Sequence, residues 1–272
     1  MNPSRSLAVI AVIGASLLGA APARAATVHW VNDGAASLNP PGTSCVDAGY
    51  TTIQAAVNAA VVGDLVNVCP GTYKENVTIG TAGLRVASTA GAVVTAVYAL
   101  QANVDTFRIQ AVRVTLDGFT IVQAGQQAKH DIGVNVYTEG STLATITNNV
   151  VRGGRIGVNL GCGSARSTVA HNRVSDSYEA GINIDTCEGS ESGSDGNSVH
   201  DNIVCGGTFP YSIAAGDKSD FNQIDHNVGR WMAVYGTGNN VHHNTAQFFN
   251  IVAGNTDFQN VVDPTACTSC SR

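Results

Sequence analysis

The stretch from Val169 to Ile184, VAHNRVSDSYEAGINI, contains two patterns that recur along the chain and decide the fold. The first pattern places a β-branched apolar residue three positions before an asparagine, as in Val169 and Asn172. The second pattern is a short run of alternating apolar and polar residues, AGINI at 180–184, which is typical of a β-strand. Because both patterns return several times, we expect a protein built from repeated structural units.

The asparagine pattern indicates stacked coils whose loops differ in length. Successive asparagines are separated by 23, 30, 25 and 17 residues. A single coil cannot bury its own apolar face, whereas a stack of coils forms a continuous core. Asparagine suits such a stack because its side chain can bond to the next coil and its backbone tolerates a tight left-handed turn. The five copies are ITNN at 146–149, VAHN at 169–172, VHDN at 199–202, IDHN at 224–227 and VHHN at 241–244.

The strand pattern predicts a polar row on the outside of the stack. If the apolar residues of each strand point inward, the intervening ones point outward, and neighbouring coils lie about 4.8 Å apart. Amide and aromatic side chains in such a row suit sugar hydroxyls. We therefore predict a substrate-binding row with aromatic residues beside it: Asn135, Asn159, Asn183 and Tyr235, with Tyr211 and Trp231.

The segment TTIQ at 51–54 is a capping-box pattern, and apolar residues follow it at helical spacing. We therefore expect a short amphipathic helix over 51–60 that closes the N-terminal end of the stack. The expected organisation is an N-terminal segment over 26–50, a parallel β-helix over 51–257 and a C-terminal cap over 258–272. The fold class is all-β.

The N-terminus resembles a secretory signal peptide over residues 1–25. An apolar run from Leu7 to Ala21 precedes the small-x-small site Ala23-Arg24-Ala25. We expect a secreted, periplasmic or cell-surface monomer that starts near Ala26 and has no membrane span. The net charge of −6 argues against nucleic acid as a partner.

The chain has seven cysteines, and an exported chain meets an oxidising compartment, so disulfides are expected. Cys45 and Cys69 flank the predicted helix, and Cys162 and Cys187 occupy nearly equivalent points of adjacent coils, so we expect both pairs to be bridged. The spacing Cys267-Thr-Ser-Cys270 leaves a redox pair or half of a metal site as the alternative to a structural role. No pairing follows for Cys205.

The stretch YTTIQAAVNAA at 50–60, then Gly63-Asp64, then VCPGTYKENV at 68–77 resembles the opening of pectin-lyase-like proteins. The resemblance, together with the repeats, covers most of residues 46–255 and implies a right-handed parallel β-helix. It implies a polysaccharide partner but no single activity, since these proteins include lyases, hydrolases, esterases, epimerases and non-enzymes. The signature motifs of pectin methylesterases and of polygalacturonases do not occur in the expected places.

Cations, carboxylates and aromatic residues stand at the start of successive predicted strands. This grouping is what β-elimination of a uronate requires. Lys129 or Arg155 is a candidate for neutraliser or base, and Tyr178 or His130 for the acid. Glu179 completes the candidate catalytic set. Oxygen ligands for Ca²⁺ are offered by Asp131, Glu179 and Asp185. We predict a polysaccharide lyase or epimerase that acts on an acidic, uronate-containing polymer.

Two alternatives stay open at this point. A non-catalytic β-helix that binds glycans or serves as an envelope component is compatible with the scarcity of lysine. A transition-metal site is the other alternative, because imidazoles and carboxylates stack beside the asparagines. Two positions before a repeated asparagine lie His200, Asp225 and His242. One position before a repeated asparagine lie His171, Asp201, His226 and His243.

Overall fold

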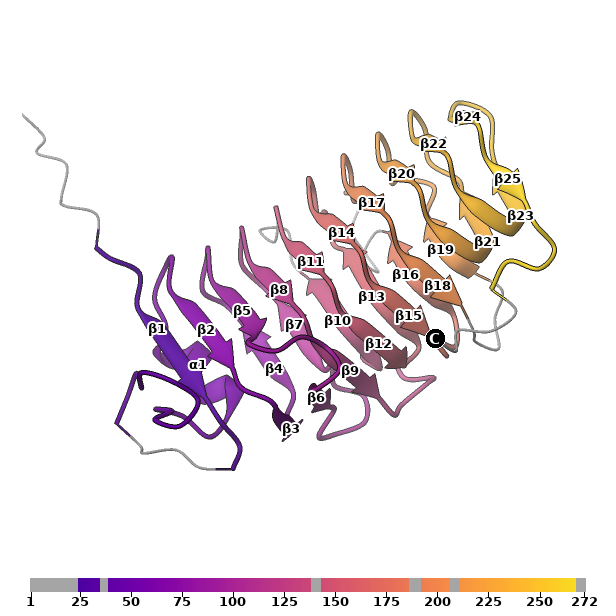
Figure 1. Cartoon of the computed structure of the whole chain (residues 1–272). Coiled ribbons are helices and arrows are strands. Elements are labelled where there is room, and N and C mark those ends of the chain that lie inside the picture. Colours follow the sequence, from indigo (N-terminus) through magenta and orange to yellow (C-terminus); the bar gives the residue numbers. More distant parts are fainter. Residues whose placement is uncertain (1–23, 35–38, 138–142, 186–191, 206–210, 268–272) are drawn as a thin grey trace, which may run out of the picture.

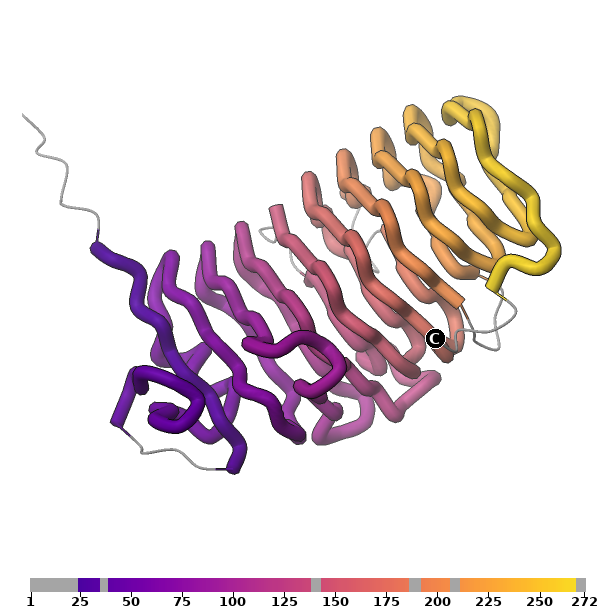
Figure 2. The backbone as a smooth tube through the Cα atoms, in the orientation of Figure 1, coloured from indigo at the N-terminus to yellow at the C-terminus, as the bar shows by residue number. Residues whose placement is uncertain are grey.

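The computed structural model describes residues 24–34, 39–137, 143–185, 192–205 and 211–267, which form an elongated stack of coils (Figures 1 and 2). Successive coils place strands at equivalent positions, and all the strand pairs are parallel. An apolar core fills the interior along the whole stack. The predicted all-β parallel β-helix is therefore confirmed.

One sheet contains a strand from each successive coil, with its central apolar residue pointing into the core. In this sheet Ile146 lies beside Val169, which lies beside Val199, and all three are fully buried. The order is β1 (Val28–Val31), β2 (Leu65–Val68), β5 (Arg85–Ser88), β8 (Thr115–Asp117), β11 (Thr145–Thr147), β14 (Thr168–Ala170), β17 (Ser198–His200), β20 (Gln223–Asp225), β22 (Asn240–His242) and β24 (Thr256–Phe258).

The remaining strands form two rows that join near the C-terminal end. The join is made by β21 (Val228–Val234), a strand long enough to pair with both rows; β23 (Thr245–Ile251) pairs with β21 and with β25 (Val261–Val262). The first row is β3 (Gly71–Lys74), β6 (Thr95–Tyr98), β9 (Thr120–Gln123), β12 (Val150–Gly153), β15 (Arg173–Ser175) and β18 (Ile203–Cys205). The second row, called the site face below, is β4 (Val77–Ile79), β7 (Phe107–Ile109), β10 (Ile132–Tyr137), β13 (Ile156–Gly161), β16 (Ala180–Ile184) and β19 (Tyr211–Ala215).

The five repeated asparagines form the predicted ladder between coils. The Oδ1 of Asn172 accepts hydrogen bonds from both the backbone N–H and the side-chain amide of Asn149, at 3.0 and 3.1 Å. The same pair of hydrogen bonds links Asn172 to Asn202, and the pattern continues along the stack to Asn244 and Asn260. Sequence analysis missed a second ladder of the same kind, which consists of Asn197, Asn222, Asn239 and Asn255.

The predicted helix is present but shorter than expected: α1 spans Ile53–Ala59. The residue that caps it is Thr52, whose side chain accepts from the Ala55 N–H, and not Thr51 as the capping-box pattern predicted. The Glu75 carboxylate accepts from the N–H groups of Ile53 and Gln54 at 2.8 and 2.9 Å. A residue from a following coil thus completes the cap, which a local motif cannot reveal.

The parallel pairing extends beyond both ends of the range 51–257. At the N-terminal end β1 pairs with β2, and at the C-terminal end β25 pairs with β23. Residues 258–262, which we expected to begin a cap, therefore continue the last coil. The helix α1 lies at the N-terminal end of the stack, beside β1 and β4 (Figure 1).

The disulfide Cys45–Cys69 is confirmed. Cys162 is disulfide-bonded, but its expected partner Cys187 lies outside the described residues. Cys267 bonds to Cys205, so it is neither half of a redox pair with the residue three positions on nor a metal ligand. That bond ties the last coil to β18.

The predicted signal-peptide residues up to position 23 lie outside the described part of the chain. Within the described part, no helix has the length and apolar character that a membrane crossing requires.

Candidate functional site

An open pocket of about 440 Å³ lies on the site face, over β10, β13 and β16. It brings together Lys129, His130, Asn135, Arg155, Asn159, Glu179, Asn183 and Asp185 from the predicted set. The other lining residues are Gln127, Ile132, Tyr137, Ile156 and Gly161. Residues from three coils, far apart in sequence, thus face one space because the coils stack in register.

The floor of the pocket is a chain of amide side chains. Asn183 donates from Nδ2 to the Oδ1 of Asn159 at 2.9 Å, and Asn159 donates in the same way to Asn135 at 2.9 Å. Asn135 is almost fully buried, whereas Asn159 and Asn183 are half-buried. These bonds orient the amides: Asn159 uses one N–H and one lone pair inside the chain, whereas the terminal Asn183 uses one N–H.

The amide chain ends on a buried carboxylate that sequence analysis missed. Asn135 donates to the Oδ2 of Asp105 at 2.9 Å, and Arg108 donates from Nε to the same oxygen at 2.9 Å. Asp105 is 2% exposed. Its Oδ1 has no hydrogen-bond partner among the described residues, and the Nδ1 of His130 lies 3.7 Å from it.

Arg108 and His130 form the edge of the pocket nearest the N-terminus. Arg108 Nη2 lies 2.9 Å from His130 Nδ1, and the guanidinium carbon lies 4.9 Å from the centre of the Tyr137 ring. A guanidinium is always a donor, so His130 Nδ1 accepts this bond and the imidazole proton resides on Nε2. Arg108 belongs to the same outward row as Asn135, one coil earlier, and the alternation in Phe107-Arg108-Ile109 was the signal for it.

Arg155 forms an ion pair with Glu179 across adjacent coils at the pocket edge. Its Nη2 also donates to the backbone carbonyl of Lys129 at 3.2 Å. The Arg155 side chain is 22% exposed and that of Glu179 is 49% exposed. The guanidinium is therefore held in place while part of it faces the pocket.

Four of the residues predicted as catalytic or substrate-binding lie elsewhere. Tyr178 precedes Glu179 but does not line the pocket. Tyr211 and Trp231 lie on the next two coils with ring centres 5.3 Å apart. Tyr235 is not in the amide row, because β21 pairs with β19 so that Ala233, two positions before Tyr235, lies beside Ala214.

The aromatic residues form a cluster of their own beyond the pocket. Trp231 lies 6.1 Å from Phe248 on the following coil, measured between ring centres. A hydrogen bond with Tyr235 is the main cause that raises the pKa of Tyr211. The indole N–H of Trp231 is buried with no acceptor among the described residues. The cluster therefore forms an aromatic surface beside the amides, with the Tyr211 hydroxyl and the Trp231 indole N–H as its polar groups.

The three residues predicted to hold Ca²⁺ do not converge. The buried Asp131 carboxylate accepts from the backbone N–H groups of Asn103 and Ala128, at 2.7 and 2.8 Å, and so holds its own loop together. Glu179 is paired with Arg155, and Asp185 lies further along the pocket. In the described ranges, the one group of three His, Cys, Asp or Glu side chains close enough for a metal lies elsewhere, so these residues do not fit a Ca²⁺ site.

No family model matches the chain, and no curated protein matches it. Among solved structures, it is similar to pectate lyase Pel9A, with 14% identity and a TM-score of 0.57 over 87% of this chain and 77% of that one. It is also similar to a deglycosylated pectin methylesterase from Aspergillus niger (12% identity, TM-score 0.49, 89% of this chain and 94% of that one). A third is the pectin methylesterase from carrot (11% identity, TM-score 0.48, 90% and 91%).

At these identities the likeness concerns the fold alone. The structural similarity to the pectate lyase, with its TM-score of 0.57, supports this assignment of the fold. The chain has the right-handed parallel β-helix fold of that enzyme, as the resemblance of its N-terminal stretch to pectin-lyase-like proteins implied. The chemistry of the pocket has to be argued from its own residues.

Proposed function

We propose that the pocket on the site face binds an acidic, uronate-containing polysaccharide and that the protein acts on it by β-elimination or by epimerisation at C5. The observation that carries the proposal is the oriented chain of Asn135, Asn159 and Asn183 beside the cations Lys129 and Arg155. The amides supply recognition of hydroxyl groups, and the cations supply recognition of a carboxylate.

The amide chain suits a polymer because it repeats with the coils. Neighbouring amides lie about 4.8 Å apart along the stack. Each side-chain amide has two N–H donors and two acceptor lone pairs, of which the chain uses one of each at Asn159. The remaining donor and acceptor match a sugar hydroxyl, which both donates and accepts. A sugar chain lying along the stack would meet such groups at the two half-buried amides, Asn159 and Asn183.

The cationic side of the pocket suits the carboxylate of a uronate. Arg155 is fixed by Glu179 and by the Lys129 carbonyl, so less side-chain freedom is lost when it binds an anion. Neutralising that carboxylate is also the chemical requirement for removing the C5 proton, because the negative charge then delocalises onto the acid group.

In the elimination, a base removes the proton from C5 and the bond between C4 and the glycosidic oxygen breaks. A C4–C5 double bond forms, and an acid protonates the departing oxygen. We assign charge neutralisation to Arg155, the base to Lys129 and the acid to His130 through its Nε2 proton. Tyr178 is the weaker choice for the acid because it does not line the pocket. Epimerisation shares the first step and returns the proton to the opposite face.

The test uses purified mature protein with pectate, alginate, hyaluronan and chondroitin. Absorbance near 235 nm reports the unsaturated product of elimination. The same incubations in D₂O, followed by NMR of the C5 position, report epimerisation through deuterium uptake without chain cleavage. The proposed catalysis is wrong if no polymer gives either signal.

Single substitutions locate the activity in the pocket. We expect Arg155→Gln and Lys129→Gln each to lower the rate at least 100-fold, since each removes charge stabilisation or the base. The matched control is Arg152→Gln, which removes an exposed arginine from β12, on another face of the stack. Equal losses in Arg152→Gln and Arg155→Gln would place the activity outside this pocket.

A second candidate function is non-catalytic glycan binding, which one observation favours. The Arg155 guanidinium already has a carboxylate partner in Glu179, so it is not a free cation waiting for substrate. Affinity electrophoresis in gels that contain each polymer separates the two functions. Retardation that Asn159→Ala abolishes, without unsaturated product or deuterium uptake, would identify a binding protein.

The proposal also covers the localisation and the oligomeric state of the protein. We propose that the chain is exported, which the disulfides Cys45–Cys69 and Cys205–Cys267 support because such bonds persist in oxidising compartments. We also propose that it acts as a monomer. Intact-mass analysis of protein recovered outside the cytoplasm should give a start near Ala26. Light scattering after size exclusion should give the monomer mass.

A further inference from the structure

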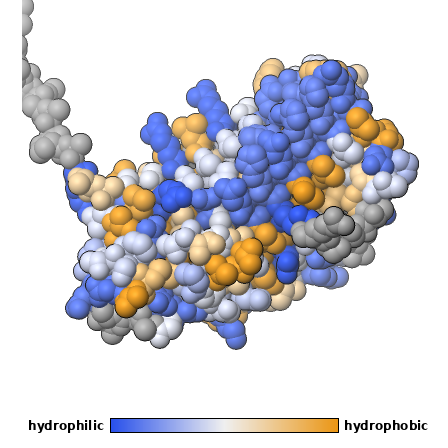
Figure 3. Space-filling model, viewed as in Figure 1, coloured by the Kyte–Doolittle hydropathy of each residue, from blue (hydrophilic) through white to orange (hydrophobic). Residues whose placement is uncertain are grey.

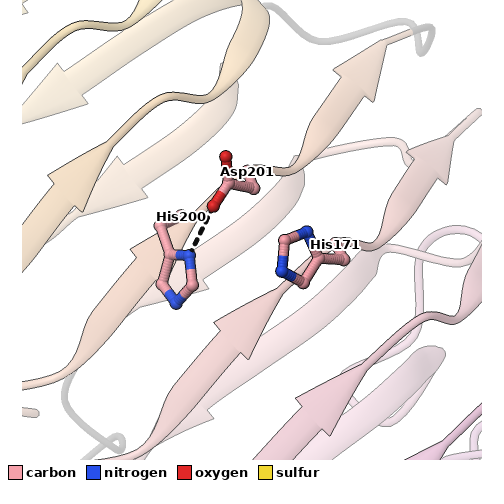
Figure 4. A group of neighbouring side chains, drawn as sticks. All are labelled: His171, His200 and Asp201. Atoms are coloured by element: carbon pink, nitrogen blue, oxygen red, sulfur yellow. Dashed lines mark hydrogen bonds and ion pairs between the residues drawn. The ribbon is translucent and has the colours of Figure 1, made fainter.

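We propose that His171, His200 and Asp201 form a binding site for a divalent transition-metal ion of the zinc type. The site lies away from the pocket on the site face, where β14 and β17 end. One ligand atom from each of the three side chains lies within 4.8 Å of the other two (Figure 4). Nothing in the proposed polysaccharide chemistry uses these residues.

The stacking of coils creates the group. His200 is the last residue of β17 and lies in register beside Ala170, the last residue of β14. His171 follows Ala170, and its N–H donates to the carbonyl of His200 at 3.3 Å. Asp201 follows His200 and lies one coil beyond His171 at the same turn position. Figure 4 shows the two imidazoles and the carboxylate directed toward one another.

The backbone that carries the three side chains adjoins the asparagine ladder. His171 and Asp201 have left-handed backbone conformations, with φ of 57° and 54°. Each immediately precedes a rung of the asparagine ladder, in which Asn172 N–H donates to Asn202 Oδ1 at 2.9 Å. A metal ion therefore has to order side chains only, which lowers the entropic cost of binding.

The donor set selects the class of metal. Two imidazoles and one carboxylate suit zinc, copper or nickel, whereas calcium and magnesium prefer six or more oxygen ligands. Three protein ligands leave an open position for water. Zinc–nitrogen bonds of about 2.0–2.1 Å place two ligands of a tetrahedral ion about 3.4 Å apart. Ligand atoms that lie as much as 4.8 Å apart must therefore approach by up to about 1.4 Å. Rotation of solvent-accessible side chains supplies such a movement.

Solvent gives an ion direct access to the group. His171 and Asp201 are exposed, and the His200 side chain is 29% exposed. On the face seen in Figure 3, hydrophilic side chains gather over the first sheet in the C-terminal half of the stack, with apolar patches toward its far end. His200 Nδ1 lies 2.8 Å from Asp201 Oδ2, so this carboxylate orients the imidazole even before it meets an ion.

The test is isothermal titration of metal-free, tag-free mature protein with Zn²⁺ at pH 7.5, because a polyhistidine tag would bind the ion itself. We expect one Zn²⁺ per chain with a dissociation constant of about 1 μM or tighter. Bound Co²⁺ should show the visible ligand-field absorption of a tetrahedral site. Failure to bind Zn²⁺ at 100 μM (about 100-fold above the expected constant) would overturn the proposal.

Variants locate the ion. His171→Asn and Asp201→Asn keep side chains that tolerate the left-handed turn, and His200→Gln keeps a strand residue. Each should weaken Zn²⁺ binding by about tenfold or more while the far-ultraviolet circular dichroism stays unchanged. The matched control is His243→Asn, at the same turn position three coils or about 14 Å away, which should bind Zn²⁺ as the parent does.

The opposite pattern is equally informative. If His243→Asn loses the ion and His171→Asn keeps it, then the metal binds at the stacked His226 and His243 rings and the proposed site is wrong. Polysaccharide activity is not measured in this experiment. The metal site and the proposed function can therefore fail independently of each other.

Discussion

Asp64 is a buried carboxylate that joins the first strand to the turn after α1. It accepts from the N–H groups of Thr27 and Val61, at 2.8 and 3.0 Å, and its Oδ2 lies 3.0 Å from His29 Nε2. Burial acts to raise the pKa of Asp64, but these hydrogen bonds and the charge of Arg24 outweigh it and lower the pKa to about 2. The ionised carboxylate therefore stabilises the folded N-terminal coil.

We expect Asp64→Asn to lower the free energy of unfolding by roughly 2 kcal/mol at pH 7. The unfolded carboxyl has a pKa of about 3.9, above that of the folded one. The stabilisation is therefore complete above about pH 4 and disappears as the pH falls toward 2. Urea unfolding of both proteins across this range should show the two curves converging at low pH.

The exposed Asp217 provides the control, because Asp217→Asn removes a carboxyl group from the surface and should change the free energy of unfolding by less than about 0.5 kcal/mol. A difference between Asp64→Asn and the parent that stays constant from pH 7 to pH 2 would contradict the assigned pKa. Signal-peptide cleavage after Ala25 would remove Arg24 but keep Thr27, Val61 and His29, so the prediction holds for the mature chain.

Sequence periodicity was sufficient to predict some residues of the site but not others. Asn135, Asn159 and Asn183 could be predicted because three strands in one sheet repeat without insertions between paired positions. Tyr235 was misplaced because the sequence pattern paired it with Ala214, whereas β21 places Ala233 there. Asp105 was missed because its importance comes from burial beneath Arg108 and Asn135, a property of packing alone.

At the scale of elements, the asparagine ladder holds each turn of the first sheet to the next. Asn202 accepts two hydrogen bonds from Asn172 and donates to the carbonyls of Val169 and His200. All these groups are shielded from water by the ladder. We expect Asn202→Ala to destabilise the protein by roughly 3 kcal/mol, because a buried polar group that loses its partner costs about 1–3 kcal/mol.

Asn250→Ala is the comparison for Asn202→Ala. Asn250 is exposed and makes one side-chain bond, at 3.2 Å, to the Tyr235 hydroxyl. Its removal should change the free energy of unfolding by less than about 0.5 kcal/mol. Chemical denaturation monitored by circular dichroism measures both variants. Equal effects at the two positions would show that the ladder does not contribute to stability through its buried bonds.

The elements themselves differ in how far sequence predicts them. Strands were predicted well, since apolar alternation and the asparagine spacing both report the same stacked core. The helix boundary was shifted by two residues at its start, because Glu75, from a later coil, and Thr52 satisfy its first N–H groups. The second asparagine ladder was missed, although Asn197, Asn222 and Asn239 each precede an apolar residue by two positions.

At the scale of the whole molecule, the stack is nearly one-dimensional, since each coil contacts mainly its two neighbours. Within the described part of the chain, the last coil has one neighbouring coil, and its strands β24 and β25 are exposed along their length. It is held by those strands, by the bond from Gln247 to the Ala266 carbonyl and by the disulfide Cys205–Cys267. Stability should therefore decrease toward this end.

We expect the double variant Cys205→Ser/Cys267→Ser to accelerate amide hydrogen exchange in β22, β24 and β25 while β8 and β11 keep the protection of the parent. Loss of a cross-link removes stabilisation where the freed segment can open, and a stack of weakly coupled units opens from its ends. The matched variant Cys45→Ser/Cys69→Ser cuts the other disulfide and should accelerate exchange around β1 and β2 instead. Mass spectrometry of exchanged peptides measures both. If either variant lowers protection equally in all coils, the β-helix unfolds as one cooperative unit, and its stability cannot be treated as a sum over neighbouring coils.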